Sequence, residues 1–234
     1  VSMSKTIQVF DLKSFCSIAT LNPASSNGYF AISNENIAWP DDVKPGRVYI
    51  ATTTDFKVKY KIDCHSSGIK TMIFSNENDL DKNFLVTTSQ KGTLVRLFDC
   101  LNGHLVSEFR RGYTQATIID IDMKYGILCV CTSSTIHVFV KSDNVSHSSV
   151  LSNVISSFVP SFVKSNANSD GLATDEGQNV HLTVTPNGVP LACSVKNDKR
   201  ILVVMNNDHL FEYEISDDYN SLSIKQAISF KIVK

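Results

Sequence analysis

Two adjacent arginines give this sequence its clearest chemical signal. They lie in the segment Phe109-Arg110-Arg111-Gly112. A guanidinium group presents paired N–H donors that match two oxygens of a phosphate group. Because neighbouring residues of a β-strand point to opposite faces, Arg110 and Arg111 cannot serve one pocket, but they could serve two pockets on either side of the strand. Two solvated surface arginines are the alternative, and an arginine pair alone does not decide between these interpretations.

Polar stretches on either side of the arginine pair favour the phosphate interpretation. Upstream are His65, at an expected junction between repeats, and the stretch from Thr88 to Arg96. Downstream is the stretch from Thr132 to His137. Both stretches offer hydroxyl groups, a cation or an imidazole, and backbone amides of turns, which is the chemistry that an anionic head group requires.

The elements that would position these side chains are β-strands. Short runs rich in β-branched and aromatic residues alternate with polar turns, and Asn-Gly pairs at 27–28, 102–103 and 187–188 fall between such runs. Only one stretch has the pattern of a helix. The sequence therefore predicts an all-β fold.

Five segments repeat one strand pattern: Thr6–Asp11, Arg47–Thr52, Thr93–Asp99, Thr135–Val140 and His209–Glu214. Marker residues in them, Phe10, Ile50, Phe98, Phe139 and Tyr213, are separated by 40, 48, 41 and 74 residues. The first three intervals match the spacing of propeller blades, and the fourth matches if residues 141–178 contain an insertion. We predict a single, partial β-propeller domain over residues 1–234, with four to five WD40-like blades beginning part-way through one blade. An open arc would expose sheet edges, so we expect further blades to precede this sequence, with a smaller complete ring as the alternative.

The segment from residue 144 to 163 differs in composition, with seven serines and no Asp, Glu, Lys or Arg. It is too polar for a transmembrane helix. Its apolar residues recur in pairs every four positions, which predicts one apolar stripe on a helix interrupted at Pro160. The stripe could pack on its own domain or enter a membrane surface.

Composition argues against several other functions. The formal net charge is −1, so no general basic field is available for binding nucleic acid. The sequence shows no phosphate-binding glycine loop and no nucleophile paired with a base, and we predict neither an enzyme nor a cofactor or metal site. The six cysteines show no paired spacing, which favours reduced, buried thiols in a cytosolic protein, although Cys129 and Cys131 would share one face of a strand.

The ordered combination of motifs resembles the PROPPIN family, the phosphoinositide-binding β-propellers that include the WIPI proteins of autophagy. The resemblance is carried by Phe109–Gly112, by the preceding strand from Ser89 to Phe98, and by Thr135 to Phe139 in the next repeat. It covers nearly the whole chain. It implies that the chain begins in the third of seven blades.

The resemblance also implies two rim pockets for phosphatidylinositol 3-phosphate and phosphatidylinositol 3,5-bisphosphate. The first would be formed by His65, Ser89, Lys91, Thr93, Arg96 and Arg110. The second would be formed by Arg111, Ser133, Ser134, Thr135 and His137. Many relatives have an acidic–basic pair where this chain has Thr132 and Ser133, so we expect the second pocket to be the weaker. The long 141–178 loop would enter the bilayer through Val154, Ile155, Phe158, Val159 and Phe162.

These features predict a monomeric, cytoplasmic protein that associates peripherally with endosomal, vacuolar or autophagic membranes. It would recruit an autophagy-related protein partner to phosphoinositide head groups. Apolar insertion and phosphate binding are each weak alone, and they would reinforce one another as linked sites. The alternative is a WD-repeat interaction scaffold whose lipid sites are degenerate.

Overall fold

A computed structural model describes residues 2–3, 6–21, 29–76, 83–140 and 180–230, and all its regular elements are β-strands. The first sheet contains β1 (Ser2–Met3), β2 (Thr6–Phe10) and β3 (Ser17–Leu21). The second contains β4 (Ala31–Ile32), β5 (Asn36–Pro40), β6 (Arg47–Thr52) and β7 (Val58–Asp63). The third contains β8 (Ile69–Asn76), β9 (Asn83–Ser89), β10 (Leu94–Asp99) and β11 (Leu105–Arg110).

The two remaining sheets complete the set. The fourth contains β12 (Ile118–Lys124), β13 (Ile127–Thr132), β14 (Ile136–Val140) and β15 (Val180–Val184). The fifth contains β16 (Pro190–Val195), β17 (Arg200–Met205), β18 (His209–Ile215) and β19 (Leu222–Ser229). In every sheet, strands adjacent in sequence pair antiparallel.

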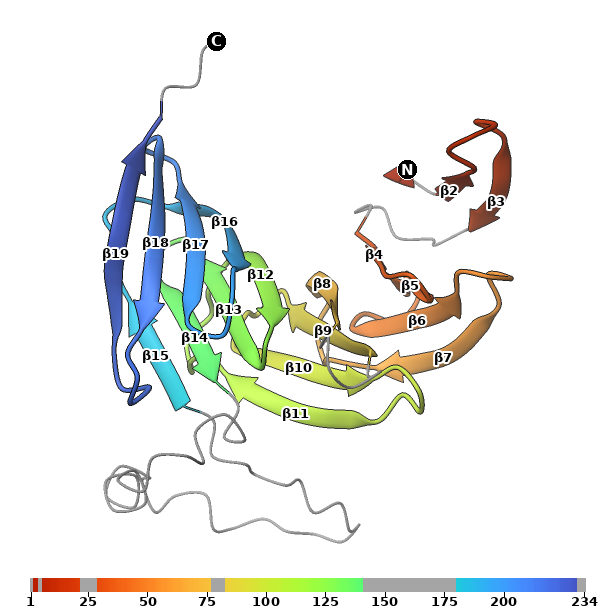
Figure 1. Cartoon of the computed structure of the whole chain (residues 1–234). Helices are drawn as coiled ribbons and strands as arrows, with labels where there is room; N and C mark the ends of the chain where they lie inside the picture. Colours follow the sequence, from red (N-terminus) through yellow and green to blue (C-terminus); the bar gives the residue numbers. More distant parts are fainter. Residues whose placement is uncertain (1, 4–5, 22–28, 77–82, 141–179, 231–234) are drawn as a thin grey trace, which may run out of the picture.

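The sheets stand side by side in an arc (Figure 1). The first strands of the four-stranded sheets meet on the inner side, where β4 contacts β8, β8 contacts β12 and β12 contacts β16. The N-terminal and C-terminal sheets lie at opposite ends of the arc, so the ring is open (Figure 1). This arrangement of four-stranded antiparallel sheets is that of propeller blades and confirms the predicted fold class.

The predicted repeat is also confirmed. The marker residues Ile50, Phe98, Phe139 and Tyr213 all lie on the third strand of their sheets. The long interval after Phe139 arises because residues 141–179 separate β14 from β15, which nevertheless pair directly, with Val140 opposite Val180. The predicted apolar stripe at 150–163 and the boundaries of the predicted loop lie outside the described residues.

Each central blade is buried on both faces, because it packs between two neighbouring sheets. On β13, Cys129 and Cys131 face a cluster shared with β16–β18, whereas Leu128 and Val130 face a cluster shared with the third sheet. All four side chains are fully buried. Full burial of a side chain such as Leu128 or Val130 contributes about 1.5–3 kcal/mol, so these contacts between sheets are a major source of stability.

Two carboxylates join the fourth and fifth sheets. Asp120 accepts a hydrogen bond from the backbone N–H of Cys193 at 2.8 Å, and Asp122 accepts one from Val195 at 2.8 Å. The hydroxyl of Ser194 also donates to Asp122, at 3.2 Å. These bonds satisfy amides of β16 that have no strand partner on that side, and they fix β16 against β12.

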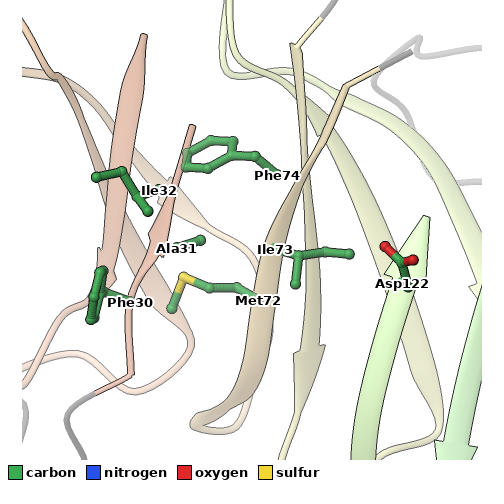
Figure 2. A pocket seen from close by; sticks show the side chains of 7 residues that line it. All are labelled: Phe30, Ala31, Ile32, Met72, Ile73, Phe74 and Asp122. Carbon is green, nitrogen blue, oxygen red and sulfur yellow. The ribbon is translucent and has the colours of Figure 1, made fainter. Parts of the chain in front are cut away.

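A hollow of about 330 Å³ lies on the inner side between β4, β8 and β12 (Figure 2). Asp122 of β12 lines one side of it. The other lining residues are apolar: Phe30, just before β4, Ala31 and Ile32 of β4, and Met72, Ile73 and Phe74 of β8. None of the residues predicted to bind phosphate lines this hollow. It is therefore separate from the candidate site.

His65 occupies the junction between the second and third sheets, as expected. Its backbone N–H and that of Cys64 donate to the carbonyl of Gly46, at 3.0 and 2.9 Å. Its Nε2 lies 3.0 Å from the Thr87 hydroxyl. Gly46 has φ +81°, and a Cβ there would lie 1.9 Å from the His65 carbonyl oxygen, so only glycine permits this contact.

The imidazole of His65 should make folding sensitive to acid. Burial lowers its pKa to about 4, and the charge of Arg96 adds to this effect. The unfolded chain therefore binds this proton first as the pH falls. The free energy of unfolding should keep the full His65 contribution above pH 6.5 and lose up to about 3 kcal/mol of it as the pH falls to about 4.

Denaturant unfolding at a series of pH values would measure this dependence. His65→Gln should reduce the decrease between pH 6.5 and 4, and the same substitution at the exposed His104 serves as the matched control. An identical slope for the parent and His65→Gln would contradict the assignment.

Candidate functional site

The double arginine ends β11, whose rotation is fixed by a buried aromatic contact. Phe109 is 2% exposed, and its ring centroid lies 5.4 Å from that of Phe139 on β14. Phe109 thus faces the fourth sheet, and Glu108 and Arg110 lie on the opposite face of the strand. Arg111, the next residue, turns towards the fourth sheet and acts electrostatically on His137 there.

Arg96 and Arg110 form a charged group on the side of the second sheet. Arg96 Nε donates to Glu108 Oε2 at 2.8 Å, and Arg96 Nη1 donates to the Cys64 carbonyl at 2.5 Å. Arg110 Nη2 lies 3.8 Å from Glu108 Oε1, and its guanidinium lies 5.2 Å from the Tyr113 ring centroid. The Arg110 side chain is 48% exposed, so its donors remain accessible to an anion.

The other residues predicted for the first pocket have differing exposures. Ser89 is buried at the end of β9, and its carbonyl accepts the Gly92 N–H, which closes the turn before β10. Lys91 is exposed in that turn and Thr93 is half-buried after it. His65 is buried, and its low pKa leaves it neutral at pH 7. The residues of the predicted first pocket that carry a positive charge are therefore Lys91, Arg96 and Arg110, and Glu108 pairs with both arginines.

Arg111 is held by backbone carbonyl groups. Its Nε donates to the Gly92 carbonyl at 2.8 Å, and its Nη2 donates to that of Thr114. Gly92 has φ +63°, and a Cβ at this position would lie 2.1 Å from the Ala116 carbonyl oxygen. The glycine of the Lys-Gly-Thr motif is thus required for the close approach of two blades and for the placement of Arg111.

The remaining residues of the second predicted set lie in the turn between β13 and β14 and on β14. Ser133 and Ser134 are exposed, and Thr132 Oγ1 orders the turn by accepting the N–H groups of Ser134 and Thr135. Thr135 Oγ1 lies 2.8 Å from His137 Nε2. The other ring nitrogen, Nδ1, lies 3.0 Å from His181 Nε2 and 3.2 Å from Thr183 Oγ1 on β15.

The two groups differ in charge. Burial lowers the pKa of His137 to about 4, with His181 and Arg111 adding to the effect, so this imidazole is neutral at pH 7. Arg111 is then the permanent cation of the second group, and burial lowers its pKa as well. The second group is therefore less positive than the first, and its arginine is less exposed than Arg110.

Two residues of the site were not predicted. Glu108 lies two positions before Arg110, and the period of two along a strand could have placed it on the same face. His181 lies 44 residues from His137, so the sequence alone gives no sign that the two are neighbours. Only the pairing of β14 with β15 brings the two imidazoles together.

The five residues predicted to enter the membrane, Val154, Ile155, Phe158, Val159 and Phe162, lie outside the described residues. Within the part of the chain that the structure describes, no helix is long and apolar enough to cross a membrane.

Sequence comparison finds relatives named for autophagy. The chain is 33% identical over 143 residues to Autophagy-related protein 21 of Schizosaccharomyces pombe, in a match covering 59% of this chain and 42% of that protein. It is 25% identical over 257 residues to Autophagy-related protein 18 of Dictyostelium discoideum, in a match covering 100% of this chain and 67% of that protein.

Solved structures share the fold. Hsv2 of Kluyveromyces lactis, described with its complete loop 6CD, superimposes with a TM-score of 0.70 at 20% identity. The match covers 97% of this chain and 70% of that structure. At this level of identity, the likeness supports the blade arrangement.

The family model described as PROPPIN matches residues 1–220. This range includes all five sheets up to β18, both arginines and the turns beside them. The chain therefore belongs to the PROPPIN family.

Proposed function

We propose that this chain is part of a peripheral membrane protein that binds phosphatidylinositol 3-phosphate and phosphatidylinositol 3,5-bisphosphate through two rim pockets. The observation that carries the proposal is the divergence of Arg110 and Arg111 at the end of β11. Arg110 lies beside Arg96 on one face, and Arg111 lies near His137 on the other. One strand end thus offers a cation to each of two polar clusters.

The first pocket has the chemistry for a phosphate dianion. Glu108 holds Arg96 closely but approaches Arg110 only to 3.8 Å, which leaves most Arg110 donors open. A phosphate near Arg110 and Lys91 would receive charge-assisted hydrogen bonds from both. The half-buried Thr93 hydroxyl and the turn amides supply further donors.

The second pocket would bind a phosphate through Arg111 and neutral donors. The exposed hydroxyl groups of Ser133 and Ser134 and the half-buried Thr135 are available for this role. A phosphate would compete with the carbonyls of Gly92 and Thr114 for the Arg111 donors. The second pocket should consequently bind phosphate with a lower affinity than the first pocket.

The 141–178 segment supplies the second half of the proposed mechanism. Its sequence has an apolar stripe that includes Phe158 and Phe162, and it joins β14 to β15 in the sheet that carries the second pocket. Insertion of this stripe into the head-group boundary would hold both pockets at the lipid surface.

The proposed biological setting is supported by the two relatives described above, both of which are named autophagy-related proteins. We propose a cytoplasmic, monomeric protein that associates with endosomal, vacuolar or autophagic membranes and recruits an autophagy-related partner there. A propeller rim bound to lipid leaves other surfaces of the blades for such a partner.

A second candidate is an interaction scaffold with degenerate lipid sites. It is favoured by the ion pairs of Glu108 with Arg96 and Arg110 and by the carbonyl contacts of Arg111. In this case the arginines would stabilise the blades rather than bind phosphate, and binding to vesicles would show no preference among phosphoinositides.

Replacement of both arginines separates the two candidates. Arg110→Gln combined with Arg111→Gln should reduce sedimentation with vesicles containing phosphatidylinositol 3-phosphate by at least about tenfold, because two charge-assisted contacts are lost. The matched control is Arg200→Gln, which removes an arginine from the ion pairs of the fifth sheet. Undiminished binding by a folded double variant would contradict the proposal.

The single substitutions should have unequal effects. Arg110→Gln should weaken vesicle binding more than Arg111→Gln, because Arg110 is the more exposed arginine and belongs to the more positive group. Isothermal titration with soluble inositol phosphate head groups would compare them. A larger loss for Arg111→Gln would show that the second pocket is the stronger one.

The apolar stripe can be tested independently of the pockets. Phe158→Asp combined with Phe162→Asp should weaken binding to vesicles but spare binding of soluble head groups, because only the bilayer contact is lost. Equal losses in both assays would indicate that the stripe packs on its own domain.

A further inference from the structure

Three cysteines meet between the fourth and fifth sheets, away from the arginines. Cys129 and Cys131 lie on β13, and Cys193 lies on β16. Their sulfur atoms all lie within 4.8 Å of one another. The sequence predicts that the first two share a face but gives no sign of the third, which is 62 residues further along the chain than Cys131. The packing of β13 against β16 brings them together.

The surroundings hold these thiols in place. Cys129 and Cys131 are fully buried in the cluster that contains Val203 and Tyr213, and Cys193 is half-buried at its border. The N–H of Cys193 is fixed by Asp120, and its Sγ lies 3.9 Å from the carbonyl oxygen of Cys129. The third thiol is thus positioned by backbone contacts.

The separation of the sulfur atoms suits a shared metal ion. Three atoms at most 4.8 Å apart all lie within about 2.8 Å of a common point, whereas a metal–thiolate bond is about 2.3 Å long. Small inward shifts would therefore place all three in bonding range.

The protonation of the cluster also differs from that of other buried thiols. Hydrogen bonds from the thiols of Cys129 and Cys193 lower the pKa of Cys131. By contrast, burial raises the pKa of Cys64 and of Cys100 to about 12. The pKa values of Cys129 and Cys193 are raised by their hydrogen bonds within the cluster, so a metal ion would displace protons from these two thiols on binding.

We infer that Cys129, Cys131 and Cys193 form a binding site for one soft metal ion, with copper(I) as the best fit. Soft thiolate ligands select such ions. No fourth Cys, His, Asp or Glu among the described residues joins the group, whereas structural zinc sites are four-coordinate. On binding, Cu–S bonds form, and the displaced thiol protons pass to the solvent. The ion would link the two blades.

Anaerobic titration with copper(I) tests this site, using a chromophoric copper(I) chelator as competitor. The exposed Cys16 is first replaced by Ser in every variant, so that it cannot contribute. The Cys16→Ser protein, which is the parent of all other variants, should retain one copper(I) per chain in competition with the chelator. It should also unfold at a higher temperature with copper(I) than without it. Zinc(II) should compete poorly.

Matched substitutions identify the ligands. Cys131→Ser and Cys193→Ser should each abolish chelator-resistant copper, whereas Cys64→Ser and Cys100→Ser, which remove buried thiols elsewhere, should retain it. Circular dichroism would confirm the fold of each variant, and Cys193→Ser provides a second test at a residue that is only half-buried.

Two results would overturn the inference. One is a folded parent that retains no copper(I) against the chelator. The other is retention by Cys131→Ser and Cys193→Ser equal to that of the parent. The Arg110/Arg111 double variant should bind copper(I) normally, so that the metal site and the lipid pockets are tested separately.

Discussion

The contact between Phe109 and Phe139 is the interaction on which the site depends. By burying Phe109 between the third and fourth sheets, it fixes the rotation of β11 about its own axis. The alternation of a strand then sends Arg110 to one side and Arg111 to the other. A different rotation of β11 would direct a charged group into the apolar interface, so the two cations diverge because the interface is packed.

Backbone contacts between blades give these side chains their surroundings. The carbonyl of Gly46 binds the amides of Cys64 and His65, while the carbonyl of Gly92 binds Arg111. Both glycines precede the third strand of a blade, and both lie too close to a neighbouring carbonyl for any side chain. A glycine before the third strand therefore permits close backbone contact at both junctions. The imidazole of His65 is buried at one junction, and the guanidinium of Arg111 is held at the other.

The repeat and the fold could be predicted from the sequence because both depend on local patterns. Markers such as Phe98 and Phe139 recur at the blade spacing, and the structure places them on equivalent strands. The absence of a nucleophile paired with a base agrees with a family of non-enzymatic lipid-binding propellers.

What could not be predicted depends on contacts between distant segments: His181 beside His137, and Cys193 beside Cys129. Glu108 is different, since strand alternation alone would have revealed its position next to Arg110 and Arg96.

The pairing of β14 with β15 has a consequence for how such proteins can diverge. Since Val140 and Val180 are already neighbours in the sheet, the chain between them starts and ends at one fixed point. The entropy of closing a loop grows only with the logarithm of its length, by about 0.6 kcal/mol for each doubling. Insertions and deletions there leave the ladder of the blade almost untouched, so this position can acquire or lose sequence over evolutionary time while the propeller itself stays constant.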